Sequence, residues 1–238
     1  GEGDNKIQGY NFRVCLTDVD SNKIPITKPD NYDPSNYELL ARIGEKKPWT
    51  YLSVPPWRKD VFVLLIISPL PNGKTDVNNY GGFSTDFIGE NWSYPEADYE
   101  TREKIKKAHE DYQKGLFYYI GHNERIPESI RNEMLEYGYC KDEFTDNGGW
   151  PFQLYVREAR RMIGEYVMTE HNVLGDTIVN DGIANGSYAM DSHHTQRIVE
   201  NGMVVNEGEF QKWSSHPYPI TYKAIVPKKE ECTNLLVP

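Results

Sequence analysis

Hydrophobic and polar positions follow a helical period most clearly in the middle of the chain. Apolar residues recur there every three or four positions, at Ile105, Ala108, Tyr112, Leu116 and Tyr119. The opposite face is rich in Glu and Lys, as on a solvated helix surface. Ser93-Tyr94-Pro95-Glu96 has capping-box spacing with proline in the first turn, so the helix is predicted to begin at Ser93 and to end near Gly121.

Other elements of the first 140 residues are shorter. A helix is predicted from Ser35 to Ile43 and another from Pro127 to Tyr137, closed by Gly138. Ile7 to Leu16 is predicted to be a strand. Val61 to Ile67 is a continuous apolar run of strand length, which is typical of a strand buried on both faces.

A turn, a short helix and a strand are predicted in the run from Asp142 to His171. Asn147-Gly148-Gly149 and Pro151 mark the turn. A short arginine-rich helix with Gly164 at its end is predicted from helical spacing of Leu154, Tyr155, Ala159 and Met162. Glu165 to Thr169 is rich in strand formers and is predicted to be extended.

The last fifty residues have a strand pattern. Tyr188 to Val199 and Met203 to Asn206 flank Asn201-Gly202, a strong hairpin turn signal. Ile220 to Val226 and Leu235 to Val237 are further predicted strands. The parts together predict an α+β fold in which helices, concentrated at about 93–138, cover one face of a largely antiparallel or mixed sheet.

Composition excludes several classes of partner. The formal net charge is −10, whereas nucleic acid or an anionic membrane would require a clustered basic face. The longest apolar run, Val61 to Ile67, is far shorter than the ~20 residues of a transmembrane helix. No transmembrane segment and no nucleic-acid partner are therefore expected, and the compartment stays open.

Neither a metal site nor a dithiol centre is expected. Cys15, Cys140 and Cys232 are widely spaced and form no Cys-x-x-Cys pair, so buried free thiols are the default prediction. The carboxylates of Asp142, Glu143 and Asp146 do not have the spacing of an EF-hand loop.

Four segments resemble a family of FAD-dependent oxidoreductases with a glutathione-reductase-like architecture. These segments are the run from Asp142 to His171, Ile7 to Thr17, Ser187 to His193, and Tyr218 to Pro227. They reach from one end of the chain to the other. The resemblance implies that residues 1–238 are a single substrate-binding domain inserted between the two halves of a flavin-binding domain.

The phosphate-binding motif of that family is missing. Its Gly-x-Gly-x-x-Gly turn lets the backbone approach the pyrophosphate at a helix N-terminus. Here Gly1-Glu2-Gly3 has Lys6 where the third glycine belongs. We therefore expect FAD to be the cofactor of a longer protein that supplies the remaining FAD-binding segments. We expect the isolated chain to be inactive and not to retain FAD.

Two adjacent histidines are candidate bases for a neighbouring substrate hydroxyl. A histidine is the natural base near neutral pH. If Tyr188 to Val199 is one strand, His193 and His194 point to opposite faces, and Asp191 shares a face with His193. Asp191 is then a candidate to orient that imidazole and to contact substrate. Purely structural histidines are the alternative.

Three further residues are candidate substrate contacts. Tyr10 and Arg13 lie in the first predicted strand, and a lone arginine among apolar neighbours needs an anion, either a structural carboxylate or an acidic substrate. Trp150 is either a stacking platform for a small, sugar-like substrate or a core anchor. The arginines at 157, 160 and 161 are expected to lock the predicted short helix to the sheet.

Two alternatives stay open at this point. The acidic, aromatic-rich composition also suits a carbohydrate-binding or accessory module of a polysaccharide-degrading protein, with Trp150 or Trp57 contacting the glycan. A purely structural interaction domain is the other alternative.

Overall fold

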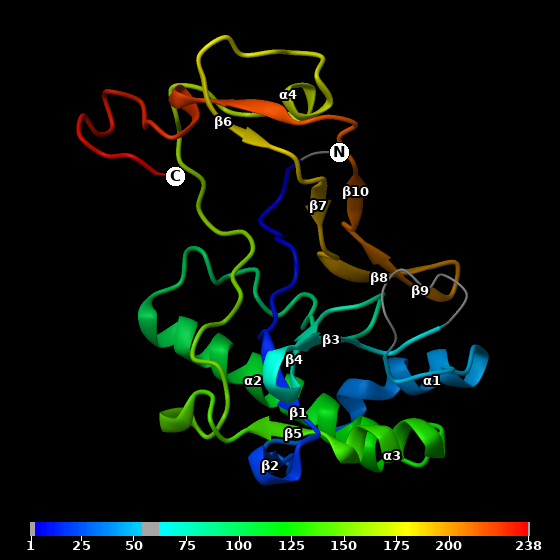
Figure 1. The fold of residues 1–238 in the computed structure, drawn as a ribbon. Coiled ribbons are helices and arrows are strands. Elements are labelled where there is room, and N and C mark those ends of the chain that lie inside the picture. The colour runs from blue at the N-terminus through cyan, green and yellow to red at the C-terminus, as the bar shows by residue number, and fades with distance from the viewer. Residues whose placement is uncertain (1–2, 54–61, 238) are drawn as a thin grey trace. The chain divides into compact units, whose positions relative to one another are not determined.

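The computed structural model describes residues 3–53 and 62–237, which divide into two compact units. Unit 1 is Gly1–Arg157 and unit 2 is Glu158–Pro238 (Figure 1). The prediction of one substrate-binding domain over residues 1–238 stays a prediction.

Unit 1 is built on a five-stranded sheet with the order β2-β5-β1-β4-β3, antiparallel at every pairing. The strands are β1 (Val14–Thr17), β2 (Lys23–Pro25), β3 (Ile66–Leu70), β4 (Lys74–Asn78) and β5 (Gly138–Cys140). Its helices are α1 (Glu38–Lys46), α2 (Tyr99–His122) and α3 (Glu128–Glu136). Helices and an antiparallel sheet in one unit confirm the predicted α+β class.

Alternation along β1 determines which face of the sheet meets α2. Val14 and Leu16 are buried, and they belong to one core cluster with Tyr112 and Leu116 of α2. Cys15 between them is half-buried on the other face. The side chain of Gln113, on α2, accepts a hydrogen bond from the N–H of Phe12 at 2.8 Å and donates one to the Phe12 carbonyl at 2.9 Å. These two bonds satisfy the backbone of Phe12, which lies just before β1.

The predicted central helix is confirmed, but its start is wrong. The chain at residues 93–97 forms turns, and α2 begins at Tyr99 with Asp98 as its N-cap, whose carboxylate accepts from Thr101 N at 2.8 Å. Arg102 donates to the carbonyls of Tyr94 and Pro95, which stabilises the turn that the capping-box pattern had suggested as helix. The helix ends at His122, next to the predicted Gly121.

The two shorter helices were predicted nearly in place. A 3₁₀ turn at Pro34–Tyr37 leads into α1, which continues three residues beyond the predicted Ile43. The helix α3 lies within the predicted range of 127–137, and its neighbour Gly138 opens β5. A Cβ on Gly138 would lie 2.4 Å from the carbonyl oxygen of Ile24, so only glycine allows this approach of β2 and β5.

Two strands of unit 1 differ from their predictions. From the predicted Ile7–Leu16, only Val14 onward enters the sheet, and Asn11 makes an isolated bridge with Tyr155. The predicted Val61–Ile67 begins outside the described residues, and the observed strand β3 starts at Ile66.

The predicted arginine-rich helix is wrong. Residues 156–163 have no regular structure, and Tyr155 pairs with Asn11, donating its N–H to the Asn11 carbonyl at 2.8 Å. This pairing and the contacts of Arg157 with the segment before β1 and with Asp86 hold the chain extended, overriding the helical spacing. The predicted strand Glu165–Thr169 is also wrong, because Thr169 caps a short helix, α4 (Glu170–Leu174), through a capping box with Asn172.

Unit 2 consists of α4 and three two-stranded antiparallel ribbons. Its strands are β6 (Gly182–Gly186), β7 (Met190–Ser192), β8 (Gln196–Glu200), β9 (Met203–Glu207), β10 (Phe210–Lys212) and β11 (Tyr218–Thr221), paired β6 with β11, β7 with β10 and β8 with β9.

The predicted hairpin at Asn201-Gly202 is confirmed. It joins β8 to β9, and both turn residues have positive φ, 51° and 76°, as a type I′ turn requires. The other strand predictions are corrected here. The predicted strand 188–199 is two strands interrupted at residues 193–195, the strand predicted at 220–226 ends at Thr221, and residues 235–237 form no strand.

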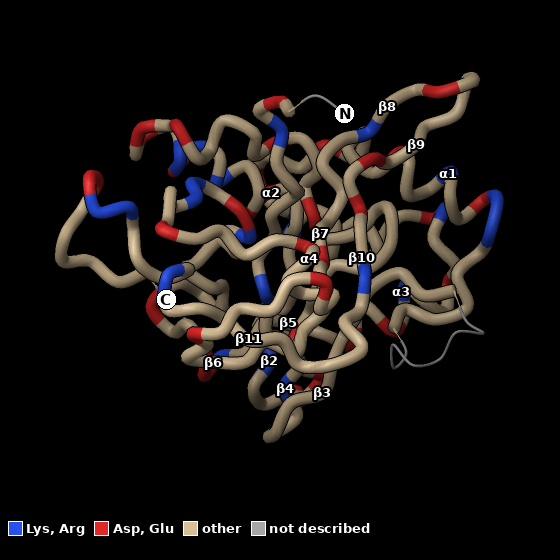
Figure 2. Tube along the Cα trace, turned by 90° about the horizontal axis from the view of Figure 1, so that it is seen from above, with Lys and Arg blue, Asp and Glu red and all other residues tan. Residues whose placement is uncertain are grey.

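Acidic and basic residues are interspersed along the described chain (Figure 2). On α2 they form ion pairs one turn apart, such as Glu100 with Lys104 and Glu110 with Lys114. Among the described residues, no helix has the length and apolar character needed to cross a membrane.

Candidate functional site

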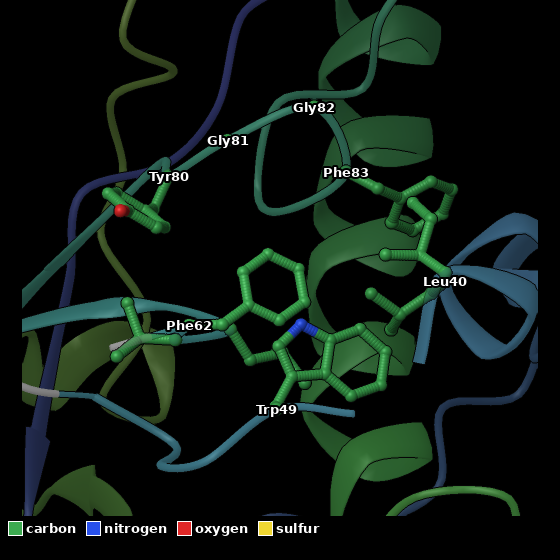
Figure 3. Close-up of a pocket in the computed structure, with 10 residues that line it drawn as sticks. Leu40, Trp49, Phe62, Tyr80, Gly81, Gly82 and Phe83 are labelled. Carbon is green, nitrogen blue, oxygen red and sulfur yellow. The ribbon is translucent and has the colours of Figure 1, made fainter. Parts of the chain in front are cut away.

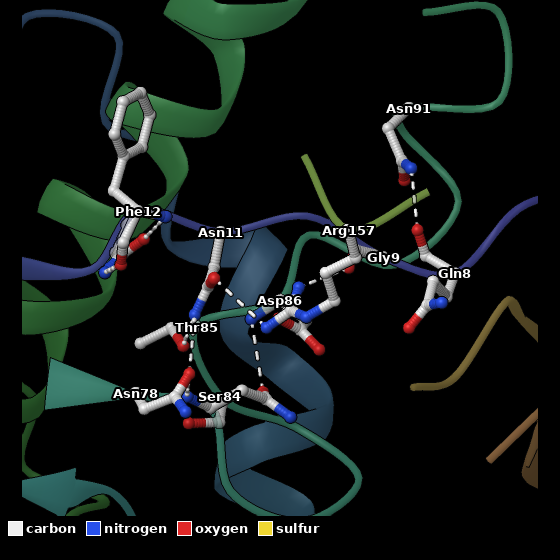
Figure 4. A network of polar contacts seen from close by, with 12 residues as sticks. Gln8, Gly9, Asn11, Phe12, Asn78, Ser84, Thr85, Asp86, Asn91 and Arg157 are labelled. Carbon is white, nitrogen blue, oxygen red and sulfur yellow. Dashed lines mark hydrogen bonds and ion pairs between the residues drawn. The ribbon is translucent and has the colours of Figure 1, made fainter. Parts of the chain in front are cut away.

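A buried ion pair lies where unit 1 ends. The side chains of Arg157 and Asp86 are 7% and 1% exposed, and Arg157 Nη1 lies 3.0 Å from Asp86 Oδ1 (Figure 4). The same guanidinium donates to the Gly9 carbonyl and, at 3.1 Å, to Asn11 Oδ1. Its outer face lies over the ring of Tyr155 at 5.0 Å. Arg157 therefore joins the segment before β1 to the loop that carries Asp86.

That loop connects β4 to α2 and docks on the first segment through polar contacts. Asn11 Nδ2 donates to Thr85 Oγ1 at 2.9 Å, and Phe87 N donates to the Tyr10 carbonyl at 3.1 Å. Asn91 Nδ2 donates to the Gln8 carbonyl at 2.8 Å (Figure 4). The side chains of Thr85, Asp86 and Asn91 therefore build an internal polar network.

The glycines of the same loop border a small cavity. Tyr80, Gly81, Gly82 and Phe83 line one side, and Trp49 and Phe62, stacked at 6.0 Å, line the other (Figure 3). The volume open to water is about 50 Å³, which is space for a water or two. A flavin ring or a sugar does not fit in this cavity as it stands.

The three predicted substrate contacts of unit 1 have structural partners. Tyr10 is buried, with its ring edge-on to Tyr94 at 5.5 Å. Arg13, just before β1, pairs with Asp76 of β4, Nε to Oδ1 at 3.0 Å, so the carboxylate considered as a structural partner is present. This pairing raises the pKa of Arg13.

Trp150 lies in the core of unit 1. It is 1% exposed and packs edge-on against Phe12 at 5.2 Å and Tyr139 at 5.5 Å, while the Lys114 ammonium lies 4.8 Å from its ring centroid. The geometry is that of a core anchor. Substrate-binding roles of Tyr10, Arg13 and Trp150 stay predictions.

The candidate bases belong to unit 2 and lie in the break between β7 and β8. The predicted alternation of faces therefore does not extend from Asp191 to His193, because the strand ends at Ser192. His194 is the more buried of the two histidines, and its Nε2 lies 3.3 Å from Glu209 Oε2. Asp191 instead accepts from Gln211 Nε2 at 3.2 Å across the β7–β10 ribbon.

Unit 2 also has an open hollow that the sequence did not suggest. It has an open volume of about 440 Å³ and is lined by Tyr166, Thr177, Ile178, Val179, Asn180, Asp181, Thr221 and Lys223. Its hydroxyl, amide and charged groups come from the segment before α4, from the α4–β6 connection, and from the end of β11 and the turn after it.

No α-helix N-terminus among the described residues is suited to the pyrophosphate of FAD. A helix N-terminus that binds a phosphate needs free backbone N–H groups and no competing anion. Each of the α-helices that the structure describes has a glutamate in its first turn, namely Glu38, Glu100, Glu128 and Glu170. The N-termini of α2 and α4 are additionally capped by the side chains of Asp98 and Thr169.

Sequence reasoning missed Asp86 and Glu209 as partners of Arg157 and His194. Neither pair shows a local motif, because 71 residues separate Asp86 from Arg157 and the second pair depends on the β7–β10 ribbon. The described residues contain no cluster of three metal-binding side chains. Trp57, one of the two tryptophans of the glycan alternative, lies outside the described residues, and nothing found supports that alternative.

Comparison with known proteins gives one match. No curated protein and no solved structure is significantly similar to the chain. The family model of the FAD dependent oxidoreductases matches residues 2–238, which is nearly the whole chain. The resemblance stated from the four segments is thereby confirmed, and the chain belongs to the FAD-dependent oxidoreductase family.

Proposed function

We propose that this chain is the substrate-binding part of an FAD-dependent oxidoreductase that oxidises a small organic molecule, with the flavin as hydride acceptor. The family match over residues 2–238 carries the proposal. Such an enzyme requires this part to bind the substrate, to orient it and to exclude water.

The isolated chain is expected to bind FAD weakly, and we propose that the remaining FAD-binding segments lie in other parts of the protein. Its helix N-termini carry glutamates, which repel a pyrophosphate. In a titration followed by flavin fluorescence, no saturation is expected in the micromolar range. Sub-micromolar binding of FAD by the isolated chain would contradict this expectation. Changing Glu170 or Glu100 to Gln should only favour an anion, so weaker FAD binding by either variant would contradict the argument from repulsion.

His194 is the stronger candidate for the base that removes a proton from the substrate. It is buried, and the nearby Glu209 carboxylate can orient the ring and stabilise its protonated form. His193 is the second candidate. Both assignments are proposals that rest on the family membership.

Changing His194 to Gln is expected to slow anaerobic flavin reduction in the complete enzyme by ~10²–10⁴-fold, the usual contribution of a general base. His171 offers a matched control in unit 2, because it also lies beside a carboxylate, Nδ1 to Asp176 Oδ2 at 3.3 Å, but is exposed. His171→Gln should leave the rate unchanged. If neither His193→Gln nor His194→Gln slows flavin reduction, a histidine base is excluded.

A further inference from the structure

Two cysteines of unit 1 face each other across neighbouring strands. Leu16 of β1 lies opposite Tyr139 of β5, so the antiparallel register places Cys15 opposite Cys140. Their sulfur atoms are 3.2 Å apart, and both residues are free thiols. The two residues are 125 positions apart in the sequence, which is why their spacing suggested no pair.

The sheet geometry at this point suits a disulfide. Residues directly opposite each other in antiparallel strands have Cα atoms roughly 4.5–5.5 Å apart. Disulfides join Cα atoms separated by about 4.4–6.8 Å. The bond between Cys15 and Cys140 therefore requires rotation of the side chains and no displacement of β1 or β5.

The pair lies on the face of the sheet opposite to α2, among charged side chains. Arg13 and Asp76 pair on one side of it, and Lys74 pairs with Asp142 and Glu143 on the other. Cys15 is half-buried and open to a small reagent, whereas Cys140 is fully buried. Burial raises the pKa of the Cys140 thiol to about 12, although Lys74 opposes this shift. Cys15 is therefore the first to react and Cys140 the resolving thiol.

We propose that Cys15 and Cys140 form a redox modification site, at which a low-molecular-weight disulfide such as glutathione disulfide converts the two thiols into a cross-strand disulfide. The Cys15 thiolate attacks one sulfur of glutathione disulfide, forms a mixed disulfide and releases one glutathione thiolate. The Cys140 thiolate then attacks the Cys15 sulfur and releases the second. The protein loses two protons and two electrons, and one glutathione disulfide becomes two glutathione molecules.

The test is equilibration of the folded chain with defined ratios of glutathione and glutathione disulfide, followed by acid quenching and mass spectrometry. The wild type is expected to lose two hydrogens and to yield a linked peptide pair containing Cys15 and Cys140. Cys232→Ser is the matched control, since it removes the third cysteine, from unit 2, and should behave as the wild type. In Cys140→Ser, glutathione should remain attached to Cys15.

A wild-type chain that keeps both thiols in excess glutathione disulfide would overturn the proposal, as would a linkage through Cys232. The wild type and Cys232→Ser decide the question even if Cys140→Ser does not fold. Oxidation should also raise the midpoint of thermal unfolding of unit 1, because a bond that closes so long a loop restricts the unfolded chain. This rise should be reversed by dithiothreitol.

Discussion

Changing Arg157 to methionine is expected to lower the free energy of unfolding of unit 1 by about 3–5 kcal/mol. The substitution keeps most of the aliphatic volume but leaves the Asp86 carboxylate, 1% exposed, without its counter-charge. It also removes the hydrogen bonds that the guanidinium donates to the Gly9 carbonyl and to Asn11 Oδ1. Urea unfolding followed by the fluorescence of the buried Trp150 measures the change.

Arg42→Met is the matched control for Arg157→Met within unit 1. Arg42 lies on α1 and also pairs with a carboxylate, that of Glu38 at 2.7 Å, but its side chain is 67% exposed. The expected loss there is about 0–1 kcal/mol, as for other surface ion pairs.

The double variant Arg157→Met/Asp86→Asn separates the charge from the packing. If the cost arises from an isolated buried charge, the double variant should be more stable than Arg157→Met alone. Equal losses for Arg157→Met and Arg42→Met would show that the buried ion pair does not stabilise unit 1.

Elements that depend on local chemistry could be predicted from the sequence. The turn at Asn201-Gly202 needs two residues that tolerate positive φ, and these two residues supply them. The buried stripe through Tyr112, Leu116 and Tyr119 indicated α2, although Ala108 of the same stripe is exposed. The start of α2 was harder to predict, because Ser93 and Asp98 are both acceptable N-caps and lie close together. The hydrogen bond from Arg102 to the Tyr94 carbonyl stabilises a turn there, and the helix starts after Asp98.

Elements that depend on distant partners could not be predicted. Helical spacing between Leu154 and Met162 is real, but the contacts that keep this segment extended come from Asn11 and Asp86. The same holds for the candidate site. The adjacent histidines were found, whereas the break after Ser192 and the partner Glu209 require the pairing of β7 with β10. Cys15 and Cys140 become neighbours only when β1 and β5 pair.

Acidification is expected to destabilise unit 1 through His109, which lies on α2 and is 1% exposed. Its Nδ1 donates to the Ile105 carbonyl at 2.8 Å, and its ring lies edge-on to Phe87 at 5.4 Å. Nε2 is buried and has no hydrogen-bond partner among the described residues. Burial lowers the pKa of His109 to about 4, although the Ile105 carbonyl and the Asp86 charge oppose this shift.

The direction of the effect follows from proton binding. Above about pH 6.5 the imidazole is neutral in both the folded and the unfolded chain, so His109 adds no pH dependence. Between about pH 6.5 and pH 4 the unfolded chain binds a proton that the folded chain does not, and stability falls as the pH falls. The total loss is about 3 kcal/mol, and below pH 4 this contribution stops growing.

His109→Gln is expected to remove this part of the pH dependence. Glutamine has no charge to acquire, so the free energy of unfolding of the variant should fall less between pH 7 and pH 4.5 than that of the wild type. Carboxylates titrate in the same range, but they do so equally in both proteins, and only the difference between the two slopes is attributed to His109.

His122→Gln is the matched control on the same helix. Its Nδ1 makes the same kind of hydrogen bond, to the Tyr118 carbonyl at 2.8 Å, but the side chain is exposed. Urea unfolding at a series of pH values should therefore give the wild-type slope for His122→Gln and a shallower one for His109→Gln. If His109→Gln keeps the wild-type slope, His109 binds its proton equally well in the folded and unfolded chains, and burial on α2 does not make the protein sensitive to acid.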